Sequence, residues 1–124
     1  YRSFYKNRND GLIKNWPKRY RLFGWLIQIK SGGSLSSHMH NEGWLSSSIY
    51  LKRPNKKKEH DGDIAFCLDG GNFPEIHKLQ SEKEIIDINK GDMVSFPSSL
   101  FHSTVPFSSD EDRVTLAFDV IPSE

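Results

Sequence analysis

Apolar and β-branched residues occur along this chain in short runs, and turn-forming residues separate the runs. The aromatic and β-branched content of these runs favours strands. The expected strands cover residues 22–29, 44–51 (the end of a longer extended stretch over 38–51), 63–68, 84–88, 92–96, a short segment from His102, and 113–121. Many short strands between Gly, Pro, Asn and Ser turns predict an all-β barrel or jelly roll with little helix.

The length of 124 residues suits one domain with a single core. Residues 1–21 are rich in Arg, Lys, Asn and aromatic side chains and contain the breaker Trp16-Pro17, so we expect a lead-in segment with at most a short helical turn. Residues 22–124 then form the barrel domain. The chain begins with Tyr1 instead of Met, and such a barrel has little helix to brace it. We therefore expect a second copy of the chain, or an upstream segment of a longer protein, beside it.

Charge and composition exclude several classes of protein. Seventeen Lys and Arg against 16 Asp and Glu leave a formal net charge of +1, which gives no electrostatic reason to expect nucleic acid or a membrane as a partner. The single cysteine, Cys67, rules out an internal disulfide and a cysteine-based zinc site. No apolar run approaches the roughly 20 residues that cross a bilayer, and no signal peptide is visible, so we expect a cytoplasmic protein.

Three histidines are the clearest chemical signal in the sequence. His38 and His40 are separated by one residue, and His102 begins a later predicted strand. On an extended segment, side chains two positions apart point to the same face, and a neighbouring strand can add a third imidazole. We interpret the group as a mononuclear iron site. The alternative is a set of structural or exposed histidines, as is usual for single histidines in strands.

The spacing of turn residues and histidines resembles the two motifs of the cupin superfamily. The residues that match are Gly32, His38 and His40 in the first motif and Gly91, Pro97 and His102 in the second. The match is partial, because the available glutamate after the first motif is Glu42, and Ser99 stands where cupins usually have glycine. The resemblance implies a double-stranded β-helix, the barrel that cupins share with the 2-oxoglutarate-dependent oxygenases.

Arg113 and Thr115, on the last predicted strand, help to separate these two groups of enzymes. A 2-oxoglutarate oxygenase needs a cation deep in the barrel for the distal carboxylate of the cosubstrate. Arginine can bind this carboxylate in a bidentate manner, with a hydroxyl two residues further along on the same face. The alternative is an exposed arginine that pairs with Asp110, Glu111 or Asp112.

Three longer stretches, residues 37–46, 96–107 and 110–120, resemble the 2OG-Fe(II) oxygenase family. Members of this family often lie at the C-terminal end of tetratricopeptide-repeat proteins. The resemblance extends over residues 22–122 and implies an enzyme that uses Fe(II), 2-oxoglutarate and dioxygen, with His38 and His102 as two of the metal ligands.

His40 stands in the position where most oxygenases of this fold have Asp or Glu. We expect His40 to be the third ligand, because three neutral imidazoles and a dianionic cosubstrate give Fe(II) a neutral inner sphere. In the alternatives, water fills the third position or Glu42 reaches it through a bulge. Tyr50 and Gln28 lie on strands that could line the pocket, and we add them as candidate cosubstrate-binding residues.

The sequence thus predicts an Fe(II)- and 2-oxoglutarate-dependent oxygenase, most simply a hydroxylase, whose substrate is a peptide, an amino acid or a small metabolite. Two other functions would use the same barrel. A cupin-type dioxygenase would bind its substrate directly to a three-histidine iron centre without 2-oxoglutarate. A binding module would keep the barrel and its metal or ligand but have no turnover. Only the first function requires Arg113 and Thr115 inside the barrel.

Overall fold

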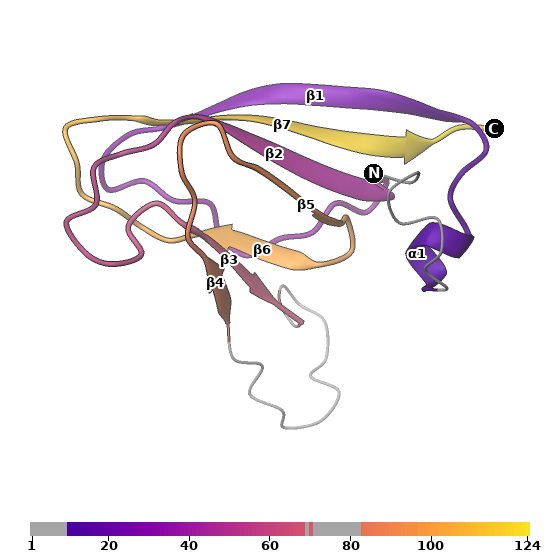
Figure 1. Cartoon of the computed structure of the whole chain (residues 1–124), viewed down its shortest axis with the longest axis horizontal. Coiled ribbons are helices and arrows are strands. Elements are labelled where there is room, and N and C mark those ends of the chain that lie inside the picture. Colours follow the sequence, from indigo (N-terminus) through magenta and orange to yellow (C-terminus); the bar gives the residue numbers. More distant parts are fainter. Residues whose placement is uncertain (1–9, 69, 71–82) are drawn as a thin grey trace.

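The computed structural model describes residues 10–68, 70 and 83–124, and in these residues it contains one short helix and seven strands (Figure 1). In chain order the elements are α1 (Gly11–Lys14), β1 (Tyr20–Ile29), β2 (Leu45–Lys52), β3 (Ile64–Cys67), β4 (Glu84–Ile86), β5 (Met93–Pro97), β6 (Phe101–Thr104) and β7 (Arg113–Pro122). Each observed strand overlaps one of the predicted strands. The prediction of an all-β fold with little helix is therefore confirmed.

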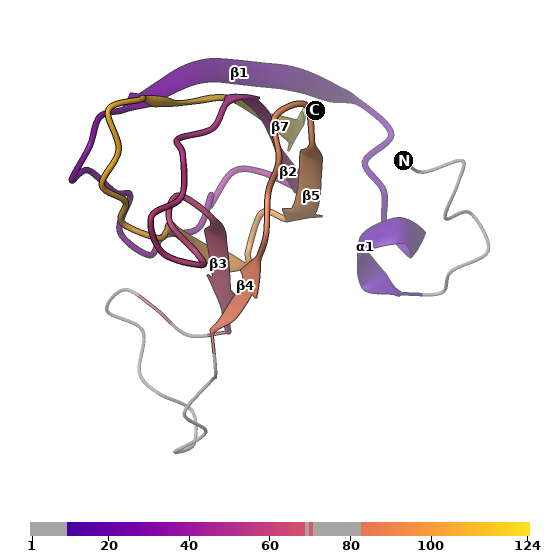
Figure 2. The same cartoon turned by 60° about the vertical axis from the view of Figure 1, so that its left-hand side comes forward.

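The strands form two antiparallel sheets, one above the other in the view of Figure 1 and turned in Figure 2. One sheet has the order β1-β7-β2-β5, and the other has the order β4-β3-β6. An isolated bridge between His38 and His102 adds the chain around residue 38 to the second sheet, beside β6. Along the chain β1 and β2 lie in the first sheet and β3 and β4 in the second, and β5, β6 and β7 then alternate between the two. This repeated passage between facing sheets gives the expected double-stranded β-helix, or jelly roll.

The two sheets enclose a core of buried side chains from Tyr50, Ile64, Ile88 and Phe96. On β7 the odd positions from 113 to 119 face this interior and are buried, as expected for a strand with period two. Three of these inward residues are polar or charged: Arg113, Thr115 and Asp119. Polar side chains on the inner face of a barrel strand require partners, and they direct attention to a site inside the barrel.

The start of the chain differs in detail from the expectation. The strand β1 begins at Tyr20, inside the predicted lead-in, and the expected helical turn is α1, whose N-cap Asp10 accepts a hydrogen bond from the backbone N–H of Ile13. The indole N–H of Trp44 donates to the carbonyl of Leu12 at 3.1 Å, so the lead-in docks against the barrel. Residues 1–9 of that segment lie outside the described residues.

The second extended stretch, predicted over residues 38–51, is divided by a turn at residues 41–42. The histidines lie before this turn and β2 begins after it, at Leu45. The backbone N–H groups of His40 and Trp44, on the two sides of the turn, donate to the carbonyls of Ser98 and Val120 at 2.9 and 2.8 Å. The turn therefore carries the chain from the second sheet, where the histidines lie, to the first.

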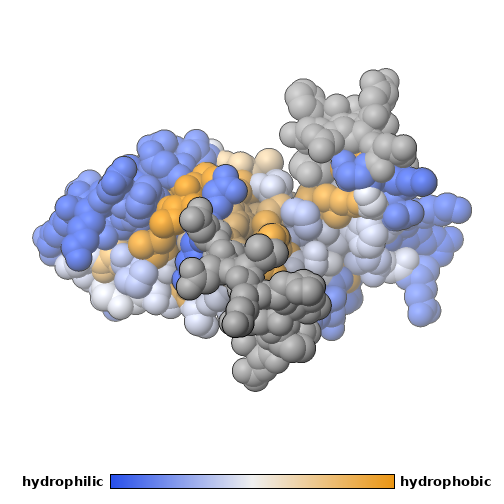
Figure 3. Space-filling model, turned by 90° about the horizontal axis from the view of Figure 1, so that it is seen from below, coloured by the Kyte–Doolittle hydropathy of each residue, from blue (hydrophilic) through white to orange (hydrophobic). Residues whose placement is uncertain are grey.

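Hydrophilic and apolar residues cover different parts of the surface. In Figure 3 the left-hand end, where loops join β2 to β3 and β6 to β7, is covered by hydrophilic residues, and apolar residues form a band over the middle. No helix within residues 10–68, 70 and 83–124 has the length and apolar character needed to cross a bilayer.

Candidate functional site

The structure brings the three predicted histidines together. One ligand atom from each of His38, His40 and His102 lies within 4.8 Å of the others. Backbone hydrogen bonds hold them in place. Reciprocal bonds of 3.0 and 2.9 Å join His38 to His102, and the N–H of His40 donates to the carbonyl of Ser98 at 2.9 Å. The segment that carries His38 and His40 thus pairs through its backbone with β6 and with the turn that precedes β6. This pairing fixes parts of the site that are far apart in the sequence.

The ring orientations of His38 and His102 leave one nitrogen of each free for a ligand. The Nδ1 atom of His38 lies 2.7 Å from the carbonyl oxygen of Ser36, and the Nδ1 atom of His102 lies 3.1 Å from that of Leu100. A carbonyl oxygen can only accept, so each Nδ1 carries the proton and each Nε2 keeps a lone pair. This is the tautomer that a metal ligated through Nε2 requires.

His40 is held by a carboxylate instead of a carbonyl. Its Nδ1 atom lies 2.9 Å from each of the two carboxylate oxygens of Asp119, on β7. The ring of Trp25 packs against the imidazole of His40 with a centroid separation of 5.4 Å, and the ring of His38 stacks on it at the same distance. His40 is therefore oriented like the other two histidines, with Nδ1 engaged and Nε2 available.

The environment of His102 favours its neutral form. Burial lowers the pKa of His102 to about 4, and the charges of His38 and His40 act in the same direction. The ring of Phe96 covers His102 with a centroid separation of 4.7 Å. Only the neutral imidazole can bind a metal, so His102 is ready to do so at neutral pH.

One cavity of about 200 Å³ joins the histidines to Arg113 and Thr115. Its lining is formed by Trp25, Ile27, Leu35, His38, His40, Ser46, Ser47, Ser48, Ile64, Phe96, His102, Ser103, Thr104, Arg113, Thr115 and Ala117. Arg113 is the one charged residue in this lining, apart from any protonated histidine. The cavity can therefore take a small molecule with a metal-binding group and an anionic group.

Arg113 is buried in the barrel, with 3% of its surface exposed. Its Nε atom donates to the carbonyl of Gly62 at 2.8 Å, its Nη1 atom donates to Oγ1 of Thr115 at 2.9 Å, and the guanidinium lies 5.0 Å from the centre of the Tyr50 ring. Burial lowers the pKa of Arg113, and the neighbouring Tyr50 and the carboxylate of Asp63 partly offset this effect. Among the described residues, no carboxylate forms an ion pair with Arg113. The arrangement differs from the alternative of an exposed arginine that pairs with its acidic neighbours.

Tyr50 lies directly beside this arginine and is fully buried. Its hydroxyl makes no well-formed hydrogen bond among the described residues, although the polar groups of Arg113 and Ser48 lie close enough to affect its pKa. Burial raises the pKa of Tyr50 to about 12, although the charge of Arg113 acts in the opposite direction. The phenol is therefore neutral and has a proton to donate, at a place where an unpaired polar atom is costly.

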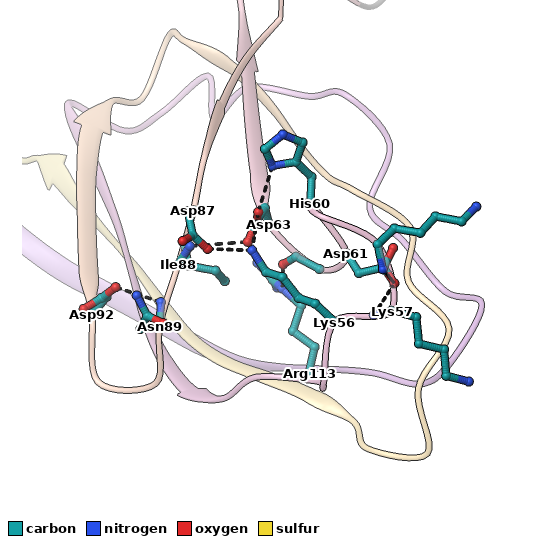
Figure 4. A network of polar contacts seen from close by, with 12 residues as sticks. Lys56, Lys57, His60, Asp61, Asp63, Asp87, Ile88, Asn89, Asp92 and Arg113 are labelled. Atoms are coloured by element: carbon teal, nitrogen blue, oxygen red, sulfur yellow. Dashed lines mark hydrogen bonds and ion pairs between the residues drawn. The ribbon is translucent and has the colours of Figure 1, made fainter.

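A network of charged residues supports the chain next to Arg113 (Figure 4). Lys56 donates to the fully buried Asp63 at 2.6 Å and to Asp87 at 2.5 Å, and Asp63 also lies 3.3 Å from Nδ1 of His60. Burial alone would lower the pKa of Lys56, but the two carboxylates outweigh it and raise the pKa. Asp63 follows Gly62, whose carbonyl accepts from Arg113, so the network helps to fix that carbonyl.

Two candidate residues lie apart from the cavity. Gln28 is exposed, and its side-chain amide donates to Asp112 at 2.5 Å instead of lining the pocket. Glu42 is also exposed and lies outside the three-histidine group, in the turn before β2. We therefore leave Gln28 and Glu42 out of the site.

Asp119 is a site residue that the sequence did not predict. It lies six positions after Arg113 and four after Thr115, so an even spacing places all three on the inner face of β7. This spacing is the signal that could have identified it. The identity of its partner, His40, depends on a contact between residues 79 positions apart.

Comparisons with known proteins agree with this geometry. Residues 24–119 match the family described as "Putative 2OG-Fe(II) oxygenase". None of the curated proteins that were compared matches the chain.

Solved structures share the fold. A prolyl-4-hydroxylase from Pseudomonas putida is similar with a TM-score of 0.62 and 16% identity, over 83% of this chain and 52% of that one. HygX from Streptomyces hygroscopicus, with nickel, 2-oxoglutarate and hygromycin B bound, is similar with a TM-score of 0.64 and 16% identity, over 84% of this chain and 57% of that one. The present chain therefore corresponds to a little over half the length of these proteins. The family match covers most of the chain, from the middle of β1 to near the end of β7, and on this basis the chain belongs to the 2OG-Fe(II) oxygenase family.

Proposed function

We propose that this protein is an Fe(II)- and 2-oxoglutarate-dependent oxygenase that hydroxylates a peptide, an amino acid or a small metabolite. One observation carries the proposal: a single cavity is lined by three imidazoles and by a buried arginine that has no carboxylate partner among the described residues. A molecule that joins a metal-binding group to a carboxylate satisfies both parts of this cavity. 2-Oxoglutarate is such a molecule.

His38, His40 and His102 would hold the metal. Imidazole nitrogen suits iron, and the engagement of all three Nδ1 atoms leaves a convergent set of Nε2 lone pairs. Since the three ligands are neutral, the dianionic cosubstrate would balance the charge of Fe(II). The donor set therefore fits the metal that the family name specifies.

Arg113, Thr115 and Tyr50 would hold the distal carboxylate of the cosubstrate. A guanidinium without an ion-pair partner inside a barrel is costly, and a bound carboxylate would relieve that cost. Thr115 accepts a hydrogen bond from Arg113 and keeps its own hydroxyl proton to donate, and Tyr50 has an unpaired hydroxyl. Arg113 and Thr115 line the cavity and would give a carboxylate both charge and directional hydrogen bonds. Tyr50 lies beside Arg113 but outside that lining, and it would add a third donor.

The remaining work of the protein is to orient the bound groups and to exclude water. When bound, the iron would supply coordination of the 2-oxo acid and the activation of dioxygen. The side chains of Trp25, Phe96 and Ile64 make much of the cavity wall apolar. Such a wall limits the access of water and strengthens the electrostatic contacts of Arg113.

A direct test is to load the protein with Fe(II) without oxygen and to titrate it with 2-oxoglutarate by calorimetry. We expect one binding site, and succinate release after oxygen is admitted. Arg113→Met should weaken 2-oxoglutarate binding by about 30-fold or more, because truncating one partner of a buried charge pair costs at least about 2 kcal/mol. Metal affinity should be unchanged. Arg21→Met, at an exposed position on β1, is the matched control.

The outcome also separates the other two functions. Iron-loaded protein that does not bind 2-oxoglutarate would overturn the proposal. In that case, oxygen consumption with a substrate that binds the metal directly would indicate a three-histidine dioxygenase. If 2-oxoglutarate binds but no succinate is released with any substrate that is added, the protein is a binding module.

A further inference from the structure

We propose that Asp119 is a positioning residue of the metal centre, which holds His40 as the third ligand in place of a carboxylate bound to the metal itself. Both carboxylate oxygens of Asp119 lie 2.9 Å from Nδ1 of His40. The group that could hold a metal contains three histidines and no carboxylate among the described residues. Asp119 therefore brings a negative charge next to this group, one side chain further out than a carboxylate ligand would be. The inference rests on the metal site of the proposed function but not on 2-oxoglutarate.

The strands fix the position of the Asp119 carboxylate. Asp119 on β7 and Ser46 on β2 are direct cross-strand partners, and the hydroxyl of Ser46 donates to Oδ1 of Asp119 at 2.6 Å. The same hydroxyl lies 2.8 Å from that of Ser98 and 3.1 Å from Nδ1 of His40. Since Ser98 also accepts the backbone N–H of His40, side chain and backbone of this histidine are tied to the same small cluster.

The close packing around Asp119 favours its contact with His40. The backbone passes over the cluster at Gly43, where a Cβ atom would lie 3.4 Å from the carboxyl carbon of Asp119 and still closer to Ser98. Asp119 is buried, with 6% of its surface exposed, and its ion-pair partner among the described residues is His40. A buried carboxylate needs such a partner, so packing and charge favour the same orientation of the imidazole.

This orientation has a chemical consequence for the ligand. A carboxylate that accepts the Nδ1 proton of a ligating histidine fixes its tautomer and makes Nε2 a stronger donor to the metal. Within the part of the chain that the structure describes, the two other histidines donate to backbone carbonyls. Asp119 would thus give His40 part of the anionic character of the carboxylate ligand that is usual at this position in the fold.

The test is the affinity for Ni(II), measured by competition with a chelator under air. Asp119→Asn should weaken binding by about 10- to 100-fold, the usual effect of removing such an outer partner. Asp110→Asn, at an exposed position before β7, is the matched control and should bind as the wild type does. Thermal unfolding of each metal-free variant verifies that the protein is folded before it is compared.

Two further measurements separate a positioning role from a merely structural one. The ¹⁵N resonances of the His40 ring should report the Nδ1–H tautomer in the wild type and a mixture of tautomers in Asp119→Asn, because the amide can also donate to Nδ1. The variant with both His40→Ala and Asp119→Asn should bind Ni(II) no more weakly than His40→Ala alone.

Wild-type Ni(II) affinity in Asp119→Asn, or in His40→Ala, would overturn the inference. An additional loss of affinity in the double variant would do so as well, because Asp119 would then act without His40. Failure of 2-oxoglutarate to bind would contradict only the proposed function, since these measurements use the metal alone.

Discussion

Arg113 and Thr115 are joined by a hydrogen bond of 2.9 Å between Nη1 and Oγ1, two positions apart on the inner face of β7. Both side chains are buried, with 3% and 2% of their surface exposed. The hydroxyl of Thr115 uses a lone pair for this bond and keeps its proton to donate. The pair therefore presents one fixed set of donors to the cavity, which is what recognition of a carboxylate requires.

The first prediction concerns this hydroxyl. Thr115→Val keeps the shape of the side chain but removes the acceptor for Arg113 and one donor to the ligand. We expect 2-oxoglutarate to bind about 10-fold more weakly, since a hydrogen bond to a charged group contributes about 1.5 kcal/mol or more. Thr115→Ser keeps the hydroxyl and should stay within about 3-fold of the wild type. Calorimetric titration of the iron-loaded variants decides the matter, and equal affinities of the Val and Ser variants would refute the assigned role.

The strands and the metal-binding group could be predicted from sequence because both depend on local patterns. Strand alternation places Arg113 and Thr115 on one face of β7, but apolar residues such as Leu116 lie on the other face, so the hydrophobic pattern alone does not show which face is inside. The spacing of His38 and His40 gives one part of the metal-binding group, and the known motifs of the fold give His102. These features need no knowledge of which strands are neighbours.

Contacts that depend on long-range pairing could not be predicted in this way. The hydrogen bond of His40 with Asp119 requires that β7 lie next to β2. Gln28 points to the face of β1 opposite to Trp25 and Ile27, and only the fold shows that these two residues line the cavity. Lys56 is part of a run of three lysines that looks like a solvated loop, yet it pairs with Asp63, which is buried. Only the folded arrangement distinguishes Lys56 from Lys57.

Tyr50→Phe should change stability and binding in opposite directions. The hydroxyl of Tyr50 is buried without a well-formed hydrogen bond among the described residues, so its removal should leave the ligand-free protein equally stable or more stable by about 1 kcal/mol. Binding of 2-oxoglutarate should weaken several-fold if the hydroxyl donates to the distal carboxylate. Urea denaturation and calorimetry measure the two effects. Tyr20→Phe, at an exposed tyrosine, is the control for which neither quantity should change.

Alkaline pH should destabilise the protein through Tyr50. Burial raises the pKa of Tyr50 from 10.0 to about 12 in the folded state, so the folded protein retains the phenolic proton that the unfolded chain loses. The resulting stability is fully present below pH 10 and is lost as the pH rises toward 12. At pH 11 the loss should be about 1.4 kcal/mol, from 1.36 kcal/mol per pKa unit. Urea denaturation at pH 8 and pH 11 should show this difference in the wild type, and a Tyr50→Phe protein that loses as much would contradict the assignment.

The last prediction compares two adjacent lysines. Lys56 is the cation closest to the fully buried carboxylate of Asp63, at 2.6 Å, whereas Lys57 is exposed. Lys56→Met leaves a buried charge without its main partner and should lower the free energy of unfolding by about 3 kcal/mol, while Lys57→Met should change it by less than about 0.5 kcal/mol. Because Asp63 adjoins Gly62, which accepts from Arg113, the folded Lys56→Met protein should also bind 2-oxoglutarate more weakly. Equal stability of the two variants would mean that the network of Figure 4 does not anchor this part of the barrel.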